Sequence, residues 1–329
     1  MTMVRPGTRP AARSIRRRVG FAAVAMLLVL LPAGPTRAAS VIGGGCLTTP
    51  QSGFAVRDLA GHAPGVPGSR GTATICGAGP PSRGLVVTDP GPSSPGPGKS
   101  LAFDEEFDGP IAFGSRWNGS TTSAYRYGNH NPGDTKLDWL TPSAITVNGG
   151  IGTFTATPSS HTLENGLRAW NTGMLTTEGT TQGFRTRTGD YAEVRVQLPS
   201  AIGAWPSLWT WFNGDSEVDG LEYHPDNPNL LEIVNHVHPA YIYDTDASNI
   251  NPGAWITVGI QFGATDDDWY LNGKPIYSDH TGVGSTWSPY LNLSLSVCDG
   301  DFHPAPKGTA PITFNVDYVR VWRSSSDDD

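Results

Sequence analysis

Apolar and polar residues alternate over several segments in the second half of the chain. In residues 190–199 every second side chain is apolar, and segments 255–262, 290–297 and 312–322 repeat this period of two. No stretch of about a dozen residues carries the apolar spacing of an amphipathic helix. Because successive side chains of a strand point to opposite faces, the pattern predicts strands that bury one face in a core. We therefore expect an all-β fold.

Turn signals separate these segments. Asn272-Gly273 lies between two apolar runs and is a strong signal for a two-residue hairpin. The chain holds 41 glycines and 28 prolines, and only 16% of its residues are charged, which argues against a helical bundle and for many tight turns. These features predict an antiparallel β-sandwich of roughly 220 residues, a size that such folds reach as one domain.

The N-terminal 39 residues have the pattern of a secretory signal. Residues 1–19 hold six arginines and no acid, Gly20–Leu31 is apolar, and small residues lead up to Ala39. The apolar run is shorter than the roughly 20 residues that span a bilayer. We expect residues 1–39 to be removed on export, which leaves a secreted, extracellular protein without a membrane anchor.

Residues 40–100 are expected to form an unfolded leader and linker. Glycine and proline make up 23 of these 61 residues, and such a stretch buries too little apolar surface to offset the entropy of ordering it. A small accessory domain is the alternative. Because export permits disulfides, Cys46 and Cys76 are candidates for one disulfide within the leader. Cys298 lies in a strand-like segment and is expected to be a lone buried thiol.

The aromatic residues mark the folded part of the chain. All ten tryptophans lie between Trp117 and Trp322. We therefore expect one folded domain over residues 101–323, followed by an acidic tail at 324–329.

Loss of the signal changes the charge of the protein. It removes seven arginines and no acid, which takes the formal net charge from −8 to −15. A protein this acidic is unsuited to binding nucleic acid, and the same repulsion disfavours polyanionic polysaccharides.

Three acids, Glu217, Asp219 and Glu222, stand close together at the centre of one apolar segment. On a regular strand Glu217 and Asp219 share a face, whereas Glu222 would point into the core, where an unpaired carboxylate is costly. A one-residue bulge at Gly220-Leu221 would return Glu222 to the face of the other two acids, and glycine tolerates a positive φ there. We expect all three carboxylates on one face.

Such a row of acids suits glycoside hydrolysis. A retaining glycosidase needs a carboxylate nucleophile and a carboxylic acid about 5–5.5 Å apart, and crowding of like charges keeps one of them protonated. A solvated acidic strand and a calcium site are the alternatives. Trp205, Trp209 and Trp211 precede the acids, and aromatic rings stack on sugars. The sequence therefore favours a carbohydrate site in which one or two of these rings bind substrate.

The motifs resemble glycoside hydrolase family 16, in its laminarinase or endo-β-1,3-glucanase group. WPSLW followed by EVDGLEY is similar to the family's tryptophan-containing strand and bulged ExDxxE motif. DEEFDG, WNTGMLTT, YAEVRVQLP and VDYVRVW match in family order over about 220 residues. The resemblance implies a concanavalin-like jelly-roll sandwich with a substrate cleft across its concave face.

The resemblance also implies a role for each acid. Glu217 would be the nucleophile, Glu222 the general acid/base, and Asp219 the residue that orients the nucleophile. No cofactor would take part in catalysis. Two residues depart from the family pattern: Gly220 stands where an aliphatic or aromatic residue is usual, and Met174 stands where laminarinases commonly have an arginine.

Further residues are implied around the site and on the opposite face. LLEIVNHVHPAY matches the family's histidine-bearing strand, with His238 at the histidine position and His236 on the same face. These histidines would contact Asp219 or sugar hydroxyls. A structural calcium on the convex face would be held by Glu106 and Asp317. Ordinary surface histidines and acids are the alternatives.

We therefore expect a secreted, monomeric, retaining endo-β-glycosidase that acts on a polysaccharide, neutral β-glucan, at β-1,3 or mixed β-1,3-1,4 linkages. A transglycosylase or an endo-β-galactanase with the same acids is an alternative, as is an inactive sandwich that only binds carbohydrate. The intact row of acids argues against a pure binder, since binding gains nothing from three repelling carboxylates. We expect no nucleic-acid partner and no membrane contact after signal cleavage.

Overall fold

The computed structural model describes residues 98–214, 216–238, 240–244 and 250–324, and in the leader 47–50 and 72–75. The chain divides into two compact units, 1–86 and 87–329. Within the described residues, no helix is long and apolar enough to cross a membrane.

The first unit holds a pair of short strands. β1 (Leu47–Pro50) and β2 (Thr72–Ile75) pair antiparallel, with Leu47 opposite Ile75. This pair lies inside the segment for which the composition predicts no fold. Cys46, Cys76, the signal and the residues after 324 lie outside the described part of the chain, so the disulfide and the cleavage site stay predictions.

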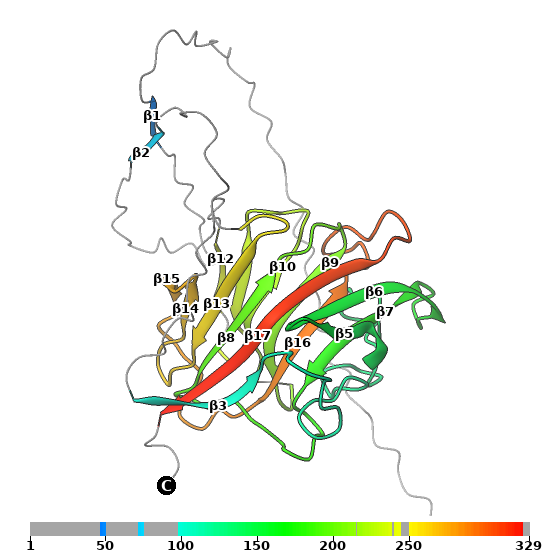
Figure 1. Ribbon diagram of the computed structural model, residues 1–329, viewed down its shortest axis with the longest axis horizontal. Helices are drawn as coiled ribbons and strands as arrows, with labels where there is room; N and C mark the ends of the chain where they lie inside the picture. Colours follow the sequence, from blue (N-terminus) through cyan, green and yellow to red (C-terminus); the bar gives the residue numbers. More distant parts are fainter. Residues whose placement is uncertain are drawn as a thin grey trace, which may run out of the picture. The chain divides into compact units, whose positions relative to one another are not determined.

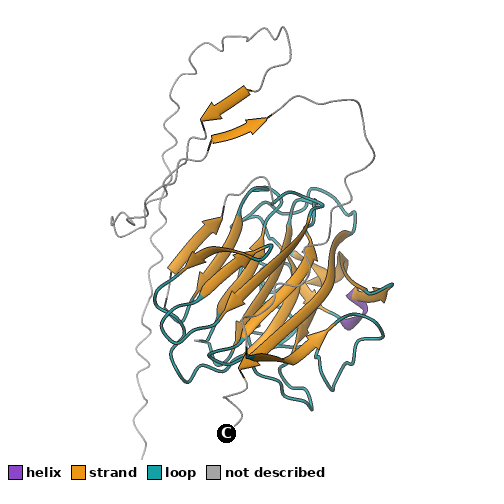
Figure 2. Ribbon diagram, turned by 60° about the vertical axis from the view of Figure 1, so that its left-hand side comes forward, coloured by secondary structure: helices purple, strands orange, loops and turns teal. Residues whose placement is uncertain are grey.

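The second unit consists of two layers of strands, which are antiparallel except where noted below (Figures 1 and 2). The first layer contains, in spatial order, β12 (Ala240–Asp244), β11 (Leu231–Asn235), β10 (Val218–Tyr223), β9 (Ala204–Trp211), β16 (Tyr290–Val297) and β7 (Arg168–Thr176). The second layer contains β6 (Ile151–Thr162), β17 (Ile312–Ser324), β8 (Tyr191–Gln197), β13 (Trp255–Gln261), β14 (Asp268–Leu271) and β15 (Lys274–Ser278).

Three further strands complete these layers. β3 (Lys99–Glu105) pairs with β17, and β5 (Ile145–Asn148) pairs with β6. β4 (Asp138–Leu140) pairs parallel with β7, and a short 3-10 helix, Pro142–Ala144, follows it. The long strand β6 joins the layers, because its first half pairs with β17 and its second half with β7.

The predicted strands are confirmed where the alternation is regular. On β8 the alternating Ala192, Val194 and Val196 are all buried, and β13 and β16 bury their apolar faces in the same way. The hairpin at Asn272-Gly273 joins β14 and β15, and both residues have positive φ (49° and 73°), as a type I′ turn requires. The prediction of an antiparallel all-β sandwich is confirmed.

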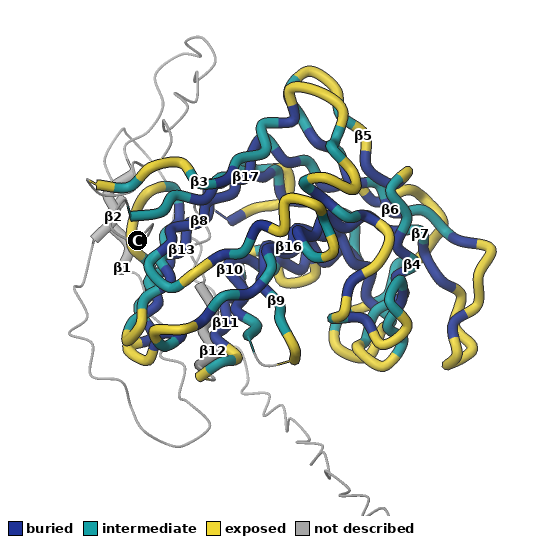
Figure 3. The backbone as a smooth tube through the Cα atoms, turned by 90° about the horizontal axis from the view of Figure 1, so that it is seen from below, coloured by how far each residue is buried: buried dark blue, intermediate teal, exposed yellow. Residues whose placement is uncertain are grey.

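The hydrophobic core lies between the two layers. Leu208 and Leu221 from the first layer join one cluster with Val194 and Ile260 from the second. Figure 3 shows the central strands of both layers as mostly buried chain. This core fixes the strands of the first layer, whose other face carries the acids.

Candidate active site

The bulge predicted in the acidic segment is confirmed by the pairing of β10. Against β9, Asp219 lies opposite Trp209, but the next pair is Leu221 with Leu208, so β10 uses one extra residue. Val218 and Leu221 are then fully buried in the core. Glu222 pairs with Ser207, which is on the same face of β9 as Trp209. The bulge therefore brings Asp219 and Glu222 to the same face of the sheet.

Gly220 serves this bulge in a different way from the one predicted. Its φ is not positive, so the expectation that glycine supplies left-handed backbone is wrong. A Cβ atom at this position would instead lie 3.3 Å from Cγ2 of Ile260 and 3.4 Å from the carbonyl oxygen of Leu208. The bulge presses the backbone against the opposite layer, and the absence of a side chain permits that contact.

Glu222 lies in a largely enclosed position next to Trp205. The indole Nε1 of Trp205 donates a hydrogen bond of 2.6 Å to Oε1 of Glu222, and Ser207 Oγ lies 3.4 Å from the same oxygen. Burial and the negative charge of Asp219 raise the pKa of Glu222 well above its usual range. Burial and the neighbouring Asp219 thus favour the protonated form of Glu222 in the free protein.

Asp219 occupies the middle of the row and contacts a histidine. Its Oδ2 lies 3.2 Å from Nε2 of His236, and its side chain is only 5% exposed. The hydrogen bond to Asp219 raises the pKa of His236, which favours the imidazolium form. The backbone N–H of His236 also donates to the carbonyl oxygen of Glu217, at 3.0 Å, so His236 links two members of the row.

The histidine that contacts Asp219 is His236, and not His238, which matches the family's histidine position. β11 ends at Asn235, and residues 236–238 form a turn, so His236 and His238 do not alternate on one strand as expected. The side chain of His238 is exposed, and its backbone N–H bonds Oδ1 of Asn235. His236 thus makes the expected contact with Asp219, and a contact of His238 with sugar hydroxyls stays a prediction.

Glu217 precedes β10 and lines an open pocket. Burial and Asp219 raise the pKa of Glu217 to about 7, and the positive charges of His236 and Lys136 act in the opposite direction. The pocket is lined by residues from the segment 124–136 and from β9: Ala124, Tyr125, Asn131, Asp134, Lys136, Trp209 and Trp211. Glu217 is thus accessible from the space where a ligand would bind.

The three predicted tryptophans differ in exposure. Trp205 and Trp209 are 7% and 6% exposed, and their indole N–H groups bond Glu222 and Ser294. Trp211 is only partly buried, lines the pocket and donates to Ser123 Oγ. Trp211 is therefore the most open of the three rings, whereas Trp205 acts on Glu222 directly.

Lys136 and Asp134 are pocket residues that the sequence reasoning missed. Nζ of Lys136 lies 2.8 Å from Asp134 Oδ2 and 4.5 Å from the ring centre of Trp205. Burial disfavours the charge of Lys136, but Asp134 and Tyr125 outweigh it and raise its pKa. The segment that holds both residues has no periodicity, and a lone lysine in a glycine- and proline-containing loop gives no signal that would have placed it here.

Met174, which stands where laminarinases commonly have an arginine, is a core residue in this fold. The side chain is fully buried in a small cluster with Tyr125, Leu140 and Trp209. An apolar residue at this position packs beneath the pocket and offers no charge to a ligand.

The two predicted calcium ligands take different partners. Glu106 forms a two-pronged pair with Arg320, at 2.6 and 2.8 Å, and Asp317 pairs with Arg195. To bind a shared calcium ion, both carboxylates would have to exchange an arginine for the ion. Calcium binding at Glu106 and Asp317 stays a prediction that competes with these ion pairs.

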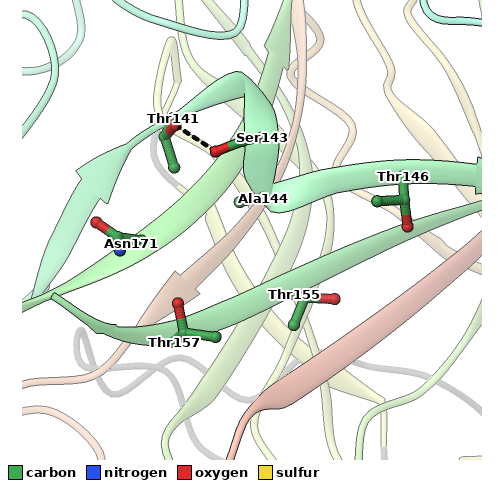
Figure 4. Close-up of a pocket in the computed structure, with 7 residues that line it drawn as sticks. All are labelled: Thr141, Ser143, Ala144, Thr146, Thr155, Thr157 and Asn171. Atoms are coloured by element: carbon green, nitrogen blue, oxygen red, sulfur yellow. Dashed lines mark hydrogen bonds between the residues drawn. The ribbon is translucent and has the colours of Figure 1, made fainter.

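Figure 4 shows a second pocket, whose lining includes none of the three acids. It is lined by the hydroxyl and amide side chains of Thr141, Ser143, Thr146, Thr155, Thr157 and Asn171, together with Ala144. No titratable side chain is among the residues that line this pocket in the described part of the chain.

Solved structures share this arrangement of strands. The laminarinase catalytic domain from Thermotoga maritima gives a TM-score of 0.58 at 20% identity, over 68% of this chain and 98% of that one. SCLam, a non-specific endo-β-1,3(4)-glucanase from family GH16, gives 0.55 at 19% identity, over 70% and 92%. This chain has the family 16 fold. The expectation of a jelly-roll sandwich is confirmed.

Curated relatives agree with the family 16 resemblance. The endo-1,3-1,4-β-glycanase EglC of Rhizobium meliloti is 24% identical over 215 residues, which cover 59% of this chain and 45% of the relative. A β-glucanase of Rhodothermus marinus is 28% identical over 267 residues, covering 70% and 87%. The chain thus spans less than half of the length of the first relative. No protein-family model matches the chain.

Proposed function

We propose that this protein is a retaining endo-β-glucanase that cleaves β-1,3 or mixed β-1,3-1,4 linkages in neutral β-glucan. The observation that carries the proposal is the bulge of β10, which turns Asp219 and Glu222 to one face beside Glu217. The family 16 fold and the names of the relatives, an endo-1,3-1,4-β-glycanase and a β-glucanase, support the choice of substrate.

The reaction would proceed in two displacements. An oxygen of Glu217 attacks the anomeric carbon while the bond to the leaving sugar oxygen breaks, and Glu222 gives its proton to that oxygen. Water then attacks the same carbon, transfers a proton to Glu222 and displaces Glu217. Two inversions at one carbon give net retention.

The neighbours of the acids suit these roles. Trp205 fixes one oxygen of Glu222, so that the carboxyl group keeps its orientation while it gives and takes a proton. Asp219 and His236 lie beside Glu217 and form a hydrogen-bonded pair that would orient the nucleophile without joining the covalent chemistry.

The experiment that tests the proposal is a reducing-end assay on laminarin, lichenan, agarose and galactan. We expect activity on laminarin or lichenan, and a loss of at least about a thousandfold in Glu217→Gln, since covalent catalysis needs that carboxylate. Asp108→Asn, an exposed acid outside the pocket, is the matched control and should retain activity. Activity on galactan alone would replace the substrate assignment, and binding without cleavage would support the carbohydrate-binding alternative.

Secretion belongs to the same proposal. The basic stretch, the apolar run and the small residues before Ser40 support cleavage of residues 1–39. N-terminal sequencing of protein from the culture medium should find a mature chain that begins near Ser40. Retention of Met1 in a cell-bound protein would contradict it.

A further inference from the structure

Asn235 is a polar residue on the core-facing side of β11. Ile233 and Leu231, two and four residues earlier on the same side, are fully buried in the core, and Asn235 is itself 0% exposed. A buried amide is unfavourable unless its polar atoms have hydrogen-bond partners. The partners of Asn235 therefore indicate which parts of the chain this side chain holds together.

The amide nitrogen of Asn235 is held by the second layer. Nδ2 lies 2.7 Å from Oδ2 of Asp279 and 3.0 Å from Oδ2 of Asp267, and it lies 3.0 Å from the carbonyl oxygen of Gly282. Asp267 comes directly before β14, and Asp279 comes directly after β15. Three acceptors around one amide nitrogen fix the direction in which the amide group points.

The two carboxylates that hold the amide are themselves fixed by backbone groups. Oδ1 of Asp279 accepts three backbone N–H groups at 2.8–2.9 Å, those of Asp267, Thr281 and Gly282. Oδ1 of Asp267 accepts the backbone N–H of Gly263 at 2.9 Å. Asp267 and Asp279 are 0% and 8% exposed. The chain segments at one end of β13, β14 and β15 thus form a buried holder for the side chain of Asn235.

The amide oxygen of Asn235 holds the turn that carries His236. Oδ1 accepts the backbone N–H groups of Val237, at 2.9 Å, and of His238, at 3.0 Å. An asparagine that binds N–H groups two and three residues later stabilises a turn at that point. This turn carries His236, whose Nε2 lies 3.2 Å from Oδ2 of Asp219.

The same part of the second layer also holds the backbone of Asp219. Trp269, a fully buried residue of β14, donates from Nε1 to the carbonyl oxygen of Asp219 at 3.2 Å. Asp267, which binds Asn235, comes two residues before Trp269. Both partners of the contact between Asp219 and His236 are therefore attached to one short segment, residues 267–269.

We propose that Asn235, held by Asp267 and Asp279, is a positioning residue that keeps the imidazole of His236 on Asp219. The inference rests on the proposed function, in which Asp219 and His236 orient the nucleophile. Among the described residues, the side chain of Asn235 neither lines the pocket nor bonds one of the three acids. Asn235 therefore acts on the site only through the turn.

The test is an NMR titration of the histidine side chains in the full-length chain, where His236 is the signal that His236→Gln lacks. In the wild type the pKa of His236 should lie above its ordinary value, because of the hydrogen bond to Asp219. Asn235→Ala should lower this pKa toward the ordinary value, since the turn loses its holder. Asn315→Ala is the matched control, because Asn315 on β17 also bonds two side chains through its amide, and it should leave the pKa of His236 unchanged.

A second variant guards against unfolding of Asn235→Ala. Asp279→Asn keeps the size of the side chain and an oxygen for the three backbone N–H groups, but it turns an NH2 group toward Nδ2 of Asn235. It should also lower the pKa of His236. Urea unfolding shows which variants are folded, and an unchanged pKa of His236 in a folded Asn235→Ala, or in Asp279→Asn where Asn235→Ala is unfolded, would overturn the proposal.

Kinetics on the preferred glucan distinguish positioning from a general loss of stability. Asn235→Ala should lower kcat about tenfold with little change of KM. If Asn235 acts through His236, a double variant with Asn235→Ala and His236→Gln should have the kcat of His236→Gln within about twofold. Losses that multiply in the double variant would overturn the proposal. Absence of glucan cleavage by the wild type would overturn the proposed function alone, because the NMR titration needs no activity.

Discussion

Nε2 of His236 lies 3.2 Å from Oδ2 of Asp219, at the point where β11 ends beside the bulge of β10. This contact joins the middle acid of the row to a turn that also binds the backbone of Glu217. The position of Glu217 therefore depends on a residue outside the acidic motif.

His236→Gln should reduce kcat by about 10- to 100-fold, because a hydrogen bond to a charged group contributes roughly 1.5–3 kcal/mol. The KM should change little, since the imidazole acts on Asp219 and not on the sugar. His238→Gln is the matched control and should keep the activity of the wild type. Steady-state kinetics on the preferred glucan measures both, and an equal loss in His238→Gln would contradict the assignment.

The hydrogen bond from Trp205 to Glu222 predicts a second loss of activity. Trp205→Phe keeps a ring of similar shape but removes the N–H donor, so kcat should fall by about 10- to 100-fold. Trp209→Phe removes a donor to Ser294 instead and should have the smaller effect on kcat. Measurement of kcat for both variants tests this prediction. A larger fall of kcat in Trp209→Phe would contradict the role of the hydrogen bond from Trp205 to Glu222.

The raised pKa of Glu217, about 7, sets the acidic side of the activity profile. A nucleophile must be ionised, so kcat/KM should increase as the pH rises through about 7. Lys136 lowers the pKa of Glu217, so Lys136→Met should move the rise of kcat/KM to higher pH. A pH profile of kcat/KM for both proteins measures the shift, and a shift to lower pH would contradict the electrostatic role of Lys136.

The same pKa predicts how stability depends on pH. Because the folded protein binds a proton on Glu217 up to about pH 7 and the unfolded chain loses it near 4.5, ionisation of this group destabilises the fold as pH rises between these values. The stability of Glu217→Gln relative to the wild type should therefore be greater at about pH 8 than at about pH 4. The expected difference is on the order of 1–2 kcal/mol after allowance for solvent. Urea unfolding at the two pH values tests this, and a stabilisation that is larger at the lower pH would contradict it.

Gly220→Ala should destabilise the protein by about 1–3 kcal/mol, because the added Cβ meets Ile260 and the carbonyl of Leu208 in a packed core. Gly308→Ala, where nothing lies within 4 Å, is the control and should have little effect on unfolding. Denaturant unfolding of both variants measures the difference. Equal stability of the two would mean that the bulge does not need glycine for space.

The strands and the bulge were predictable from the sequence because both follow from local alternation. Val218 and Leu221 can both face the core only if a bulge adds one residue between them. The cost of burying the carboxylate of Glu222 indicated this bulge. The residues around the acids were harder to place. His236 lies in a turn that breaks the alternation, and Lys136 reaches the pocket through a loop, so both depend on tertiary contacts that no local pattern encodes.

The role of Glu217 as nucleophile is tested by replacing it with alanine and supplying azide as an external nucleophile. If Glu217 attacks the anomeric carbon, azide fills its place while Glu222 still protonates the leaving oxygen, and the product is an α-glycosyl azide. NMR spectroscopy identifies the anomer. We expect Glu217→Ala to form the α-azide, and formation of the β-azide by that variant would instead make Glu217 the acid/base.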